Sequence, residues 1–86
     1  MLDERLQEKR KQVDQLDQQI VGLLVERSRL IDQIGKLKPI AYDPEREANV
    51  LANVARVATE NGLDADFVQN LYINIIGYFR AQQEGK

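Results

Sequence analysis

Three cations on the apolar seam of one segment are the side chains best suited to chemistry in this sequence. Positions 10 to 38 contain a seam at alternating steps of three and four residues, the spacing of a coiled-coil core. Its members are Arg10, Val13, Asp17, Ile20, Leu24, Arg27, Ile31, Ile34 and Lys38. A buried ammonium or guanidinium group costs several kcal/mol unless an opposite charge accompanies it. The seam therefore predicts either carboxylate partners within the protein or a bound anion.

The spacing of these cations favours an anion site shared between two copies of the chain. Arg27 and Lys38 are 11 residues apart, so they share a helix face at roughly 16 Å from each other. Arg10 precedes Arg27 by 17 residues, roughly 25 Å along a straight helix, which is too far to serve the same site. In an antiparallel two-fold pair, Arg10 of one copy reaches the Arg27–Lys38 region of the other. Snorkelling side chains and surface ion pairs are the structural alternatives.

One long helix is required to carry this seam. Residues 3–38 lack proline, and their apolar residues follow a helical rather than a strand-like period. Such a helix is roughly 54 Å long, whereas a compact chain of this size has a radius of gyration of about 12 Å. We expect a second copy to cover the projecting half, because a chain of 86 residues without cysteine is only marginally stable alone.

Two shorter helices follow the long one. Pro39 ends the long helix, because the residue before a proline is disfavoured in the α region. Asp43 is a favourable N-cap for a second helix over residues 44–60, which begins with a proline and stops before an Asn-Gly pair. Asp64 caps a third helix that extends to about Gln83. We predict an all-α chain with one long and two shorter helices.

The composition excludes several classes of protein. The net charge is −2, with 12 basic and 14 acidic residues mixed along the chain, unlike the basic stripe of a nucleic-acid binder. No apolar run approaches the roughly 20 residues that cross a bilayer, and the start of the chain lacks a signal-peptide pattern. Histidine and cysteine are absent, which argues against a zinc or haem site. We expect a cytoplasmic protein without a metal, a cofactor, a nucleic-acid partner or a membrane partner.

Several short motifs, in their order and spacing, resemble the all-helical chorismate mutases over nearly the whole chain. They are Arg10, Leu23 to Arg27, Ile34 to Lys38, Tyr42 to Glu47, Gly62 to Asp64, Ile75-Ile76 and Gln82-Gln83. The resemblance implies one domain over residues 1–86 and an intertwined homodimer with two equivalent sites. It also implies the rearrangement of chorismate to prephenate in phenylalanine and tyrosine biosynthesis.

The resemblance assigns catalytic roles to the cations and to one amide. Arg27 and the partner's Arg10 would bind the two carboxylates of chorismate, and Lys38 and Gln83 would donate hydrogen bonds to the ether oxygen. A Claisen rearrangement is unimolecular and needs no nucleophile. The enzyme folds the substrate into its reactive conformer and stabilises charge that develops on the ether oxygen.

The resemblance also defines a wall around the substrate ring. Glu47 would hold the ring hydroxyl, with Asp43 and Arg46 beside it. Two features depart from the family pattern. Phe79 stands where the family has a hydroxyl residue that assists a substrate carboxylate, and the linker 39–42 is about half the usual length.

Two alternatives to the mutase remain open. Isochorismate-pyruvate lyase shares the fold, and the segments Glu60–Asp64 and Tyr78-Phe79 resemble those lyases. Asp43 and Glu47 favour the mutase, because the lyases often lack such groups. The second alternative is a non-catalytic helical dimerisation module, in which the seam is only a pairing surface.

Overall fold

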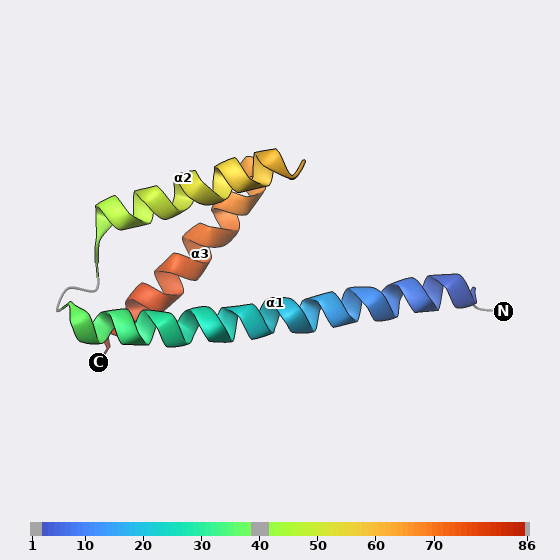
Figure 1. The fold of residues 1–86 in the computed structure, drawn as a ribbon, viewed down its shortest axis with the longest axis horizontal. Coiled ribbons are helices and arrows are strands. Elements are labelled where there is room, and N and C mark those ends of the chain that lie inside the picture. The colour runs from blue at the N-terminus through green and yellow to red at the C-terminus, as the bar shows by residue number, and fades with distance from the viewer. Residues whose placement is uncertain (1–2, 39–41, 86) are drawn as a thin grey trace. The chain divides into compact units, whose positions relative to one another are not determined.

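The chain is built from three α-helices and short connections (Figure 1). The computed structural model describes residues 3–38 and 42–85, and these contain no strand. The helices are α1 (Glu4–Leu37), α2 (Pro44–Glu60) and α3 (Ala65–Glu84). The predicted all-α class, with one long and two shorter helices, is confirmed. Pro39, Ile40 and Ala41 of the predicted short linker lie outside the described residues.

Internal contacts divide the chain into two units, Met1–Gln33 and Ile34–Lys86. The second unit contains the last turn of α1 together with α2 and α3, and every site contact described below lies within it. That residues 1–86 act as one domain stays a prediction, as does the homodimer.

Much of the apolar seam of α1 is exposed in the single chain. No described residue of α1 is buried. On the seam, Val13, Ile20 and Ile34 are 54%, 55% and 45% exposed, whereas Leu24 and Ile31 are half-buried. Covering an aliphatic side chain of this size contributes about 1.5–3 kcal/mol. The seam therefore has the character of a surface that gains stability when another helix covers it.

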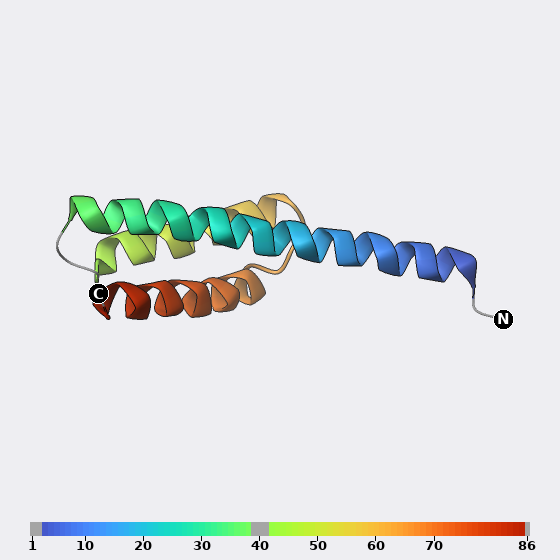
Figure 2. The ribbon, with the colours of Figure 1, turned by 90° about the horizontal axis from the view of Figure 1, so that it is seen from below.

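α2 and α3 form a helical hairpin whose turn is visible in Figures 1 and 2. Gly62 has a φ of +76°, which glycine adopts without a steric penalty. The amides of Gly62 and Leu63 donate to the carbonyl oxygens of Thr59 and Ala58 at 3.2 and 2.9 Å, the two bonds of a Schellman motif. The predicted stop at Asn61-Gly62 is thus confirmed.

The tightest packing of the hairpin lies near this turn. Ala58, close to the end of α2, is the one buried residue in the described part of the chain, at 5% exposure. In Figure 1 the two helices diverge from the turn towards Pro44 and Glu84. A side-chain hydrogen bond also joins the two helices, because the Gln69 amide donates to the carbonyl oxygen of Leu51 at 3.2 Å. Hydrogen bonds therefore add to the apolar packing between α2 and α3.

Candidate functional site

Asp43 begins α2 as its N-cap. Its Oδ1 accepts a hydrogen bond from the backbone N–H of Arg46 at 3.1 Å, and Pro44 occupies the start of the helix. Proline fits there because the missing N–H would have no partner within the helix. The predicted cap is confirmed, and it fixes where the acidic and basic residues of the first turn point.

The second oxygen of Asp43 binds Lys38. Lys38 Nζ donates to Asp43 Oδ2 at 3.2 Å, and the side chains are 37% and 44% exposed. The hydrogen bond from the Arg46 N–H, followed by that from Lys38, lowers the pKa of Asp43 from its ordinary value of 3.8. One carboxylate thus caps α2 and holds the ammonium group at the end of α1.

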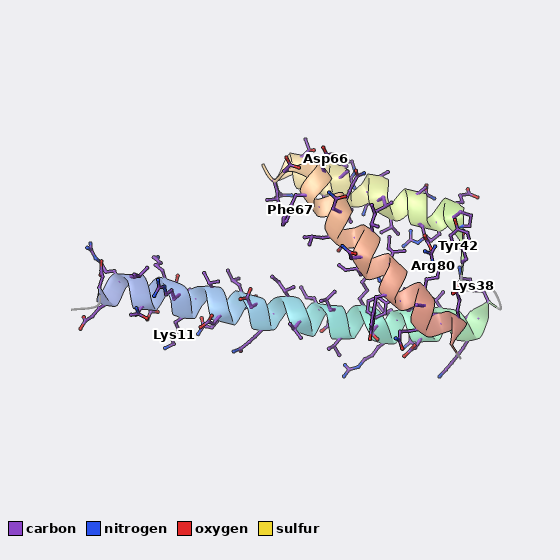
Figure 3. All side chains as sticks on the ribbon, turned by 180° about the vertical axis from the view of Figure 1, so that it is seen from behind. Lys11, Lys38, Tyr42, Asp66, Phe67 and Arg80 are labelled. Carbon is purple, nitrogen blue, oxygen red and sulfur yellow. The ribbon has the colours of Figure 1, made fainter. Side chains whose placement is uncertain are left out.

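Glu47 is held by a residue that sequence reasoning missed. Arg80 Nη1, on α3, donates to Glu47 Oε1 at 3.0 Å and to Oε2 at 3.2 Å. The Arg80 guanidinium carbon also lies 4.7 Å from the centroid of the Tyr42 ring, within the range of a cation–π contact. Figure 3 shows Lys38, Tyr42 and Arg80 near one another, at the opposite end of α3 from Asp66 and Phe67.

The helical period of residues 76–83 could have identified Arg80 as a candidate site residue. Arg80 follows Ile76 by four residues and precedes Gln83 by three, so the three share one face of α3. A cation on the face that carries a predicted catalytic amide is a candidate for the same site. Glu47, with which Arg80 forms its ion pair, lies 33 residues earlier in the chain. No local sequence pattern predicts a pairing over this separation.

Gln83 lies against α1 at Gly35. A methyl group built on Gly35 would overlap the Gln83 Oε1 atom, and its nearest other contacts are also atoms of the Gln83 amide. Lys38 follows Gly35 by three residues, and its backbone N–H donates to the carbonyl of Ile34 at 3.2 Å, so it continues the same helical turn. The structure therefore brings Gln83 and Lys38, the two predicted ether donors, to the same end of α1.

Phe79 packs beside an aromatic neighbour. Its ring centroid is 5.1 Å from that of Tyr78, with an interplanar angle of 81°, an edge-to-face arrangement. Phe79 is half-buried whereas Tyr78 is 59% exposed. A phenyl ring donates no conventional hydrogen bond. Phe79 therefore cannot supply the hydrogen bond that the family's hydroxyl residue would give to a substrate carboxylate.

Arg10 and Arg27 belong to the other unit, Met1–Gln33. Arg10 is exposed, and no ion pair within the described part of the chain includes it. Arg27 is half-buried, with its Nη1 atom shielded from solvent. Their predicted grouping with Lys38 around one anion stays a prediction.

The described residues form neither a metal-binding cluster nor a membrane-spanning helix. No cluster of three or more acidic side chains suited to hold a metal ion occurs among residues 3–38 and 42–85. Within the same ranges, no helix has the length and apolarity needed to span a membrane.

Replacing Asp43 with asparagine tests the ion pair with Lys38. Asparagine also caps helices, so Asp43→Asn keeps the cap and removes the charge. Because the folded-state pKa of Asp43 is lowered, its stabilisation is complete above the ordinary value and is lost as pH falls through the folded-state value. We expect the variant to be less stable near neutral pH, and the difference to shrink towards about pH 2.

Thermal unfolding followed by circular dichroism across this pH range measures the difference. Asp64→Asn is the matched control, because Asp64 caps α3 through Phe67 N at 2.9 Å and no described ion pair includes it. A stability difference for Asp43→Asn that stays constant with pH would contradict the assignment.

Some known proteins are similar to this chain over most of their own length. The family model for chorismate mutase type II matches residues 9–84. An isochorismate pyruvate lyase from Pseudomonas aeruginosa is 38% identical over 77 residues, covering 86% of this chain and 76% of that protein. A chorismate mutase from Methanocaldococcus jannaschii is 29% identical over 86 residues, covering 94% of this chain and 86% of that protein.

One relative contains a similar sequence within a larger protein. A T-protein from Haemophilus influenzae is 34% identical over 73 residues, which is 79% of this chain and 19% of that protein. The family match extends from residue 9 to residue 84 and so includes all the predicted site residues. This chain therefore belongs to the chorismate mutase type II family, as the order and spacing of its motifs predicted.

Proposed function

We propose that this protein is a chorismate mutase that converts chorismate to prephenate. The observation that carries the proposal is the approach of the Gln83 amide to Gly35, three residues before Lys38. Two long side chains with N–H donors, Gln83 from α3 and Lys38 directly after α1, thus lie at the same end of α1. A cytoplasmic location stays a prediction from the sequence.

The proposed chemistry needs only these donors and a shaped site. As the ether C–O bond breaks, negative charge develops on its oxygen, and Lys38 and Gln83 donate hydrogen bonds to it. Fixed donors stabilise this charge more in the transition state than in the ground state, which is the condition for catalysis. Lys38 is anchored by Asp43 at 3.2 Å, so its ammonium group is oriented before substrate binds.

Carboxylate recognition is assigned to a second copy of the chain as well as the first. In the proposed homodimer, Arg27 binds one substrate carboxylate and the partner's Arg10 binds the other. The seam of α1, on which Val13 and Ile20 are more than half exposed, supports this association. Phe79 would contact the substrate near the carboxylate without a hydrogen bond.

The ring hydroxyl is assigned to the first turn of α2. Glu47 accepts its hydrogen bond, and Asp43 and Arg46 complete the wall. Glu47 and Asp43 each already contact a cation, Arg80 and Lys38 respectively. Both carboxylates are thereby held at the start of α2, which is the arrangement that the mutase assignment requires.

Isochorismate-pyruvate lyase is the second candidate activity. It is favoured by the 38% identity to the Pseudomonas aeruginosa lyase over 77 residues. The two activities use different substrates and give different products, so one assay distinguishes them. A non-catalytic dimerisation module is the third possibility and predicts no turnover of either substrate.

Loss of chorismate absorbance by the purified protein, without added metal or cofactor, tests the mutase. We expect prephenate as the product. Lys38→Met should lower kcat by about 10²–10³-fold, since it removes a donor to a developing oxyanion. Lys36→Met is the matched control, because Lys36 lies in the same last turn of α1 and is exposed.

Isochorismate assayed in parallel separates the rival activities. Formation of salicylate and pyruvate with no prephenate from chorismate would replace the mutase by the lyase. Absence of turnover of both substrates would leave the dimerisation module. An equal loss of activity in the Lys36 and Lys38 variants would contradict the role of Lys38.

Gly35→Ala tests the contact that positions Gln83. Alanine has the higher helix propensity by about 1 kcal/mol, so the variant should be as stable as the native protein or more stable. The new methyl group occupies the space of the Gln83 amide, so we expect that amide to move and kcat to fall by on the order of 10²-fold. Thermal unfolding and steady-state kinetics on the same preparation measure both effects.

Gly22→Ala is the matched control for this substitution. Gly22 lies in the same helix and is exposed, and apart from its neighbouring helix backbone no described atom lies within 4 Å of the added methyl group. It should gain stability and keep its activity. Unchanged turnover in Gly35→Ala would show that the position of Gln83 at Gly35 has no role in catalysis.

A further inference from the structure

Arg80 makes the ion pair that connects the first turn of α2 to the last turns of α3. Its Nη1 atom lies 3.0 and 3.2 Å from the two oxygens of Glu47. The Arg80 and Glu47 side chains are 35% and 23% exposed, compared with 59% and 57% for the Arg56–Glu60 pair on α2. Partial removal from solvent strengthens the attraction between the charges. The Arg80–Glu47 pair is therefore the stronger candidate for fixing a side-chain position.

The same guanidinium also contacts the residue that leads into α2. Its central carbon lies 4.7 Å from the centroid of the Tyr42 ring, and Tyr42 directly precedes the N-cap Asp43. A planar guanidinium can cover an aromatic face while its N–H groups bind a carboxylate, and an ammonium group cannot reproduce both contacts. Arg80 thus contacts both Tyr42, just before α2, and Glu47 in the first turn of α2.

The ion pair between Arg80 and Glu47 also affects how a negatively charged substrate would bind. The proposed substrate is a dianion, and an unpaired Glu47 carboxylate beside it would repel it. Arg80 supplies the compensating positive charge, as Lys38 does for Asp43. An ionised carboxylate has about four lone-pair sites, so Glu47 can still accept a hydrogen bond from a substrate hydroxyl.

We propose that Arg80 is the positioning residue of the ring-hydroxyl site, which orients Glu47 and neutralises it so that a dianionic substrate is accepted. The inference rests on the proposed function for the role of Glu47. Arg80 itself touches neither the substrate nor the breaking bond, so it acts through Glu47. Its loss is therefore expected to raise KM more than it lowers kcat.

Steady-state kinetics on Arg80→Met tests this inference. We expect KM for chorismate to rise on the order of tenfold with a smaller change in kcat. Arg80→Lys keeps the charge but loses the fork that covers both Glu47 oxygens and the Tyr42 ring. It should therefore recover part of the native KM. A role limited to stability would change the unfolding temperature without this division between KM and kcat.

A double-mutant cycle shows whether Arg80 acts through Glu47. In a Glu47→Gln background there is no carboxylate to neutralise, so adding Arg80→Met should change KM by about twofold or less. Arg56→Met is the matched control. It removes the ion pair between Arg56 and Glu60, whose charged atoms are 2.9 Å apart, and neither residue belongs to the proposed site. Its kinetic constants should equal those of the native protein.

The outcomes separate this inference from the proposed function. Native protein that turns over chorismate, together with an unchanged KM in Arg80→Met, overturns the role of Arg80 alone. The same rise in KM with and without the Glu47 carboxylate also overturns it, because Arg80 would then act independently of Glu47. Native protein that is inactive on chorismate overturns the proposed function and this inference together.

Discussion

The long helix α1 has an apolar seam that the described residues of its own chain leave partly exposed, and the rest of the proposed enzyme depends on covering it. Val13 and Ile20 are each more than half exposed, and each would contribute about 1.5–3 kcal/mol on burial. The seam also carries Arg10 and Arg27 among its apolar residues. A second copy that covers the seam would therefore place cations next to apolar groups, where an anionic ligand compensates them. In this way one association would provide both stability and substrate binding.

Paired charges determine the local structure where α2 begins. Asp43 caps the helix and binds Lys38, while Glu47 binds Arg80. Each acidic group thus has a cation from another helix, so the wall can offer hydrogen-bond acceptors to a hydroxyl without repelling a dianion. Histidine and cysteine are absent from the sequence. An electrostatic mechanism built from fixed donors is consistent with that composition, since a unimolecular rearrangement requires neither a nucleophile nor a general base.

Local chemistry made the helices predictable from the sequence. Pro44, Gly62 and the N-cap Asp64 determine helix ends through contacts within a few residues, and the structure confirms those ends. The order of short motifs made the family predictable. The contact of Arg80 with Glu47 was missed, because it joins residues 33 positions apart and depends on how α3 returns along α2. The family resemblance grouped Gln83 with Lys38, but the contact of Gln83 with Gly35 was not predicted, for the same reason. The shared site stays a prediction, because it requires a second chain.

Activity in mixed dimers measures most directly whether two chains build one site. Arg10→Ala and Arg27→Ala should each be inactive alone, since each proposed site needs one residue from each chain. In a heterodimer of the two variants, one site carries both substitutions and the other carries neither. Random assortment of equal amounts should then restore about a quarter of the native activity. If differently tagged variants co-purify as heterodimers and turnover stays at the level of the separate variants, the shared site is wrong.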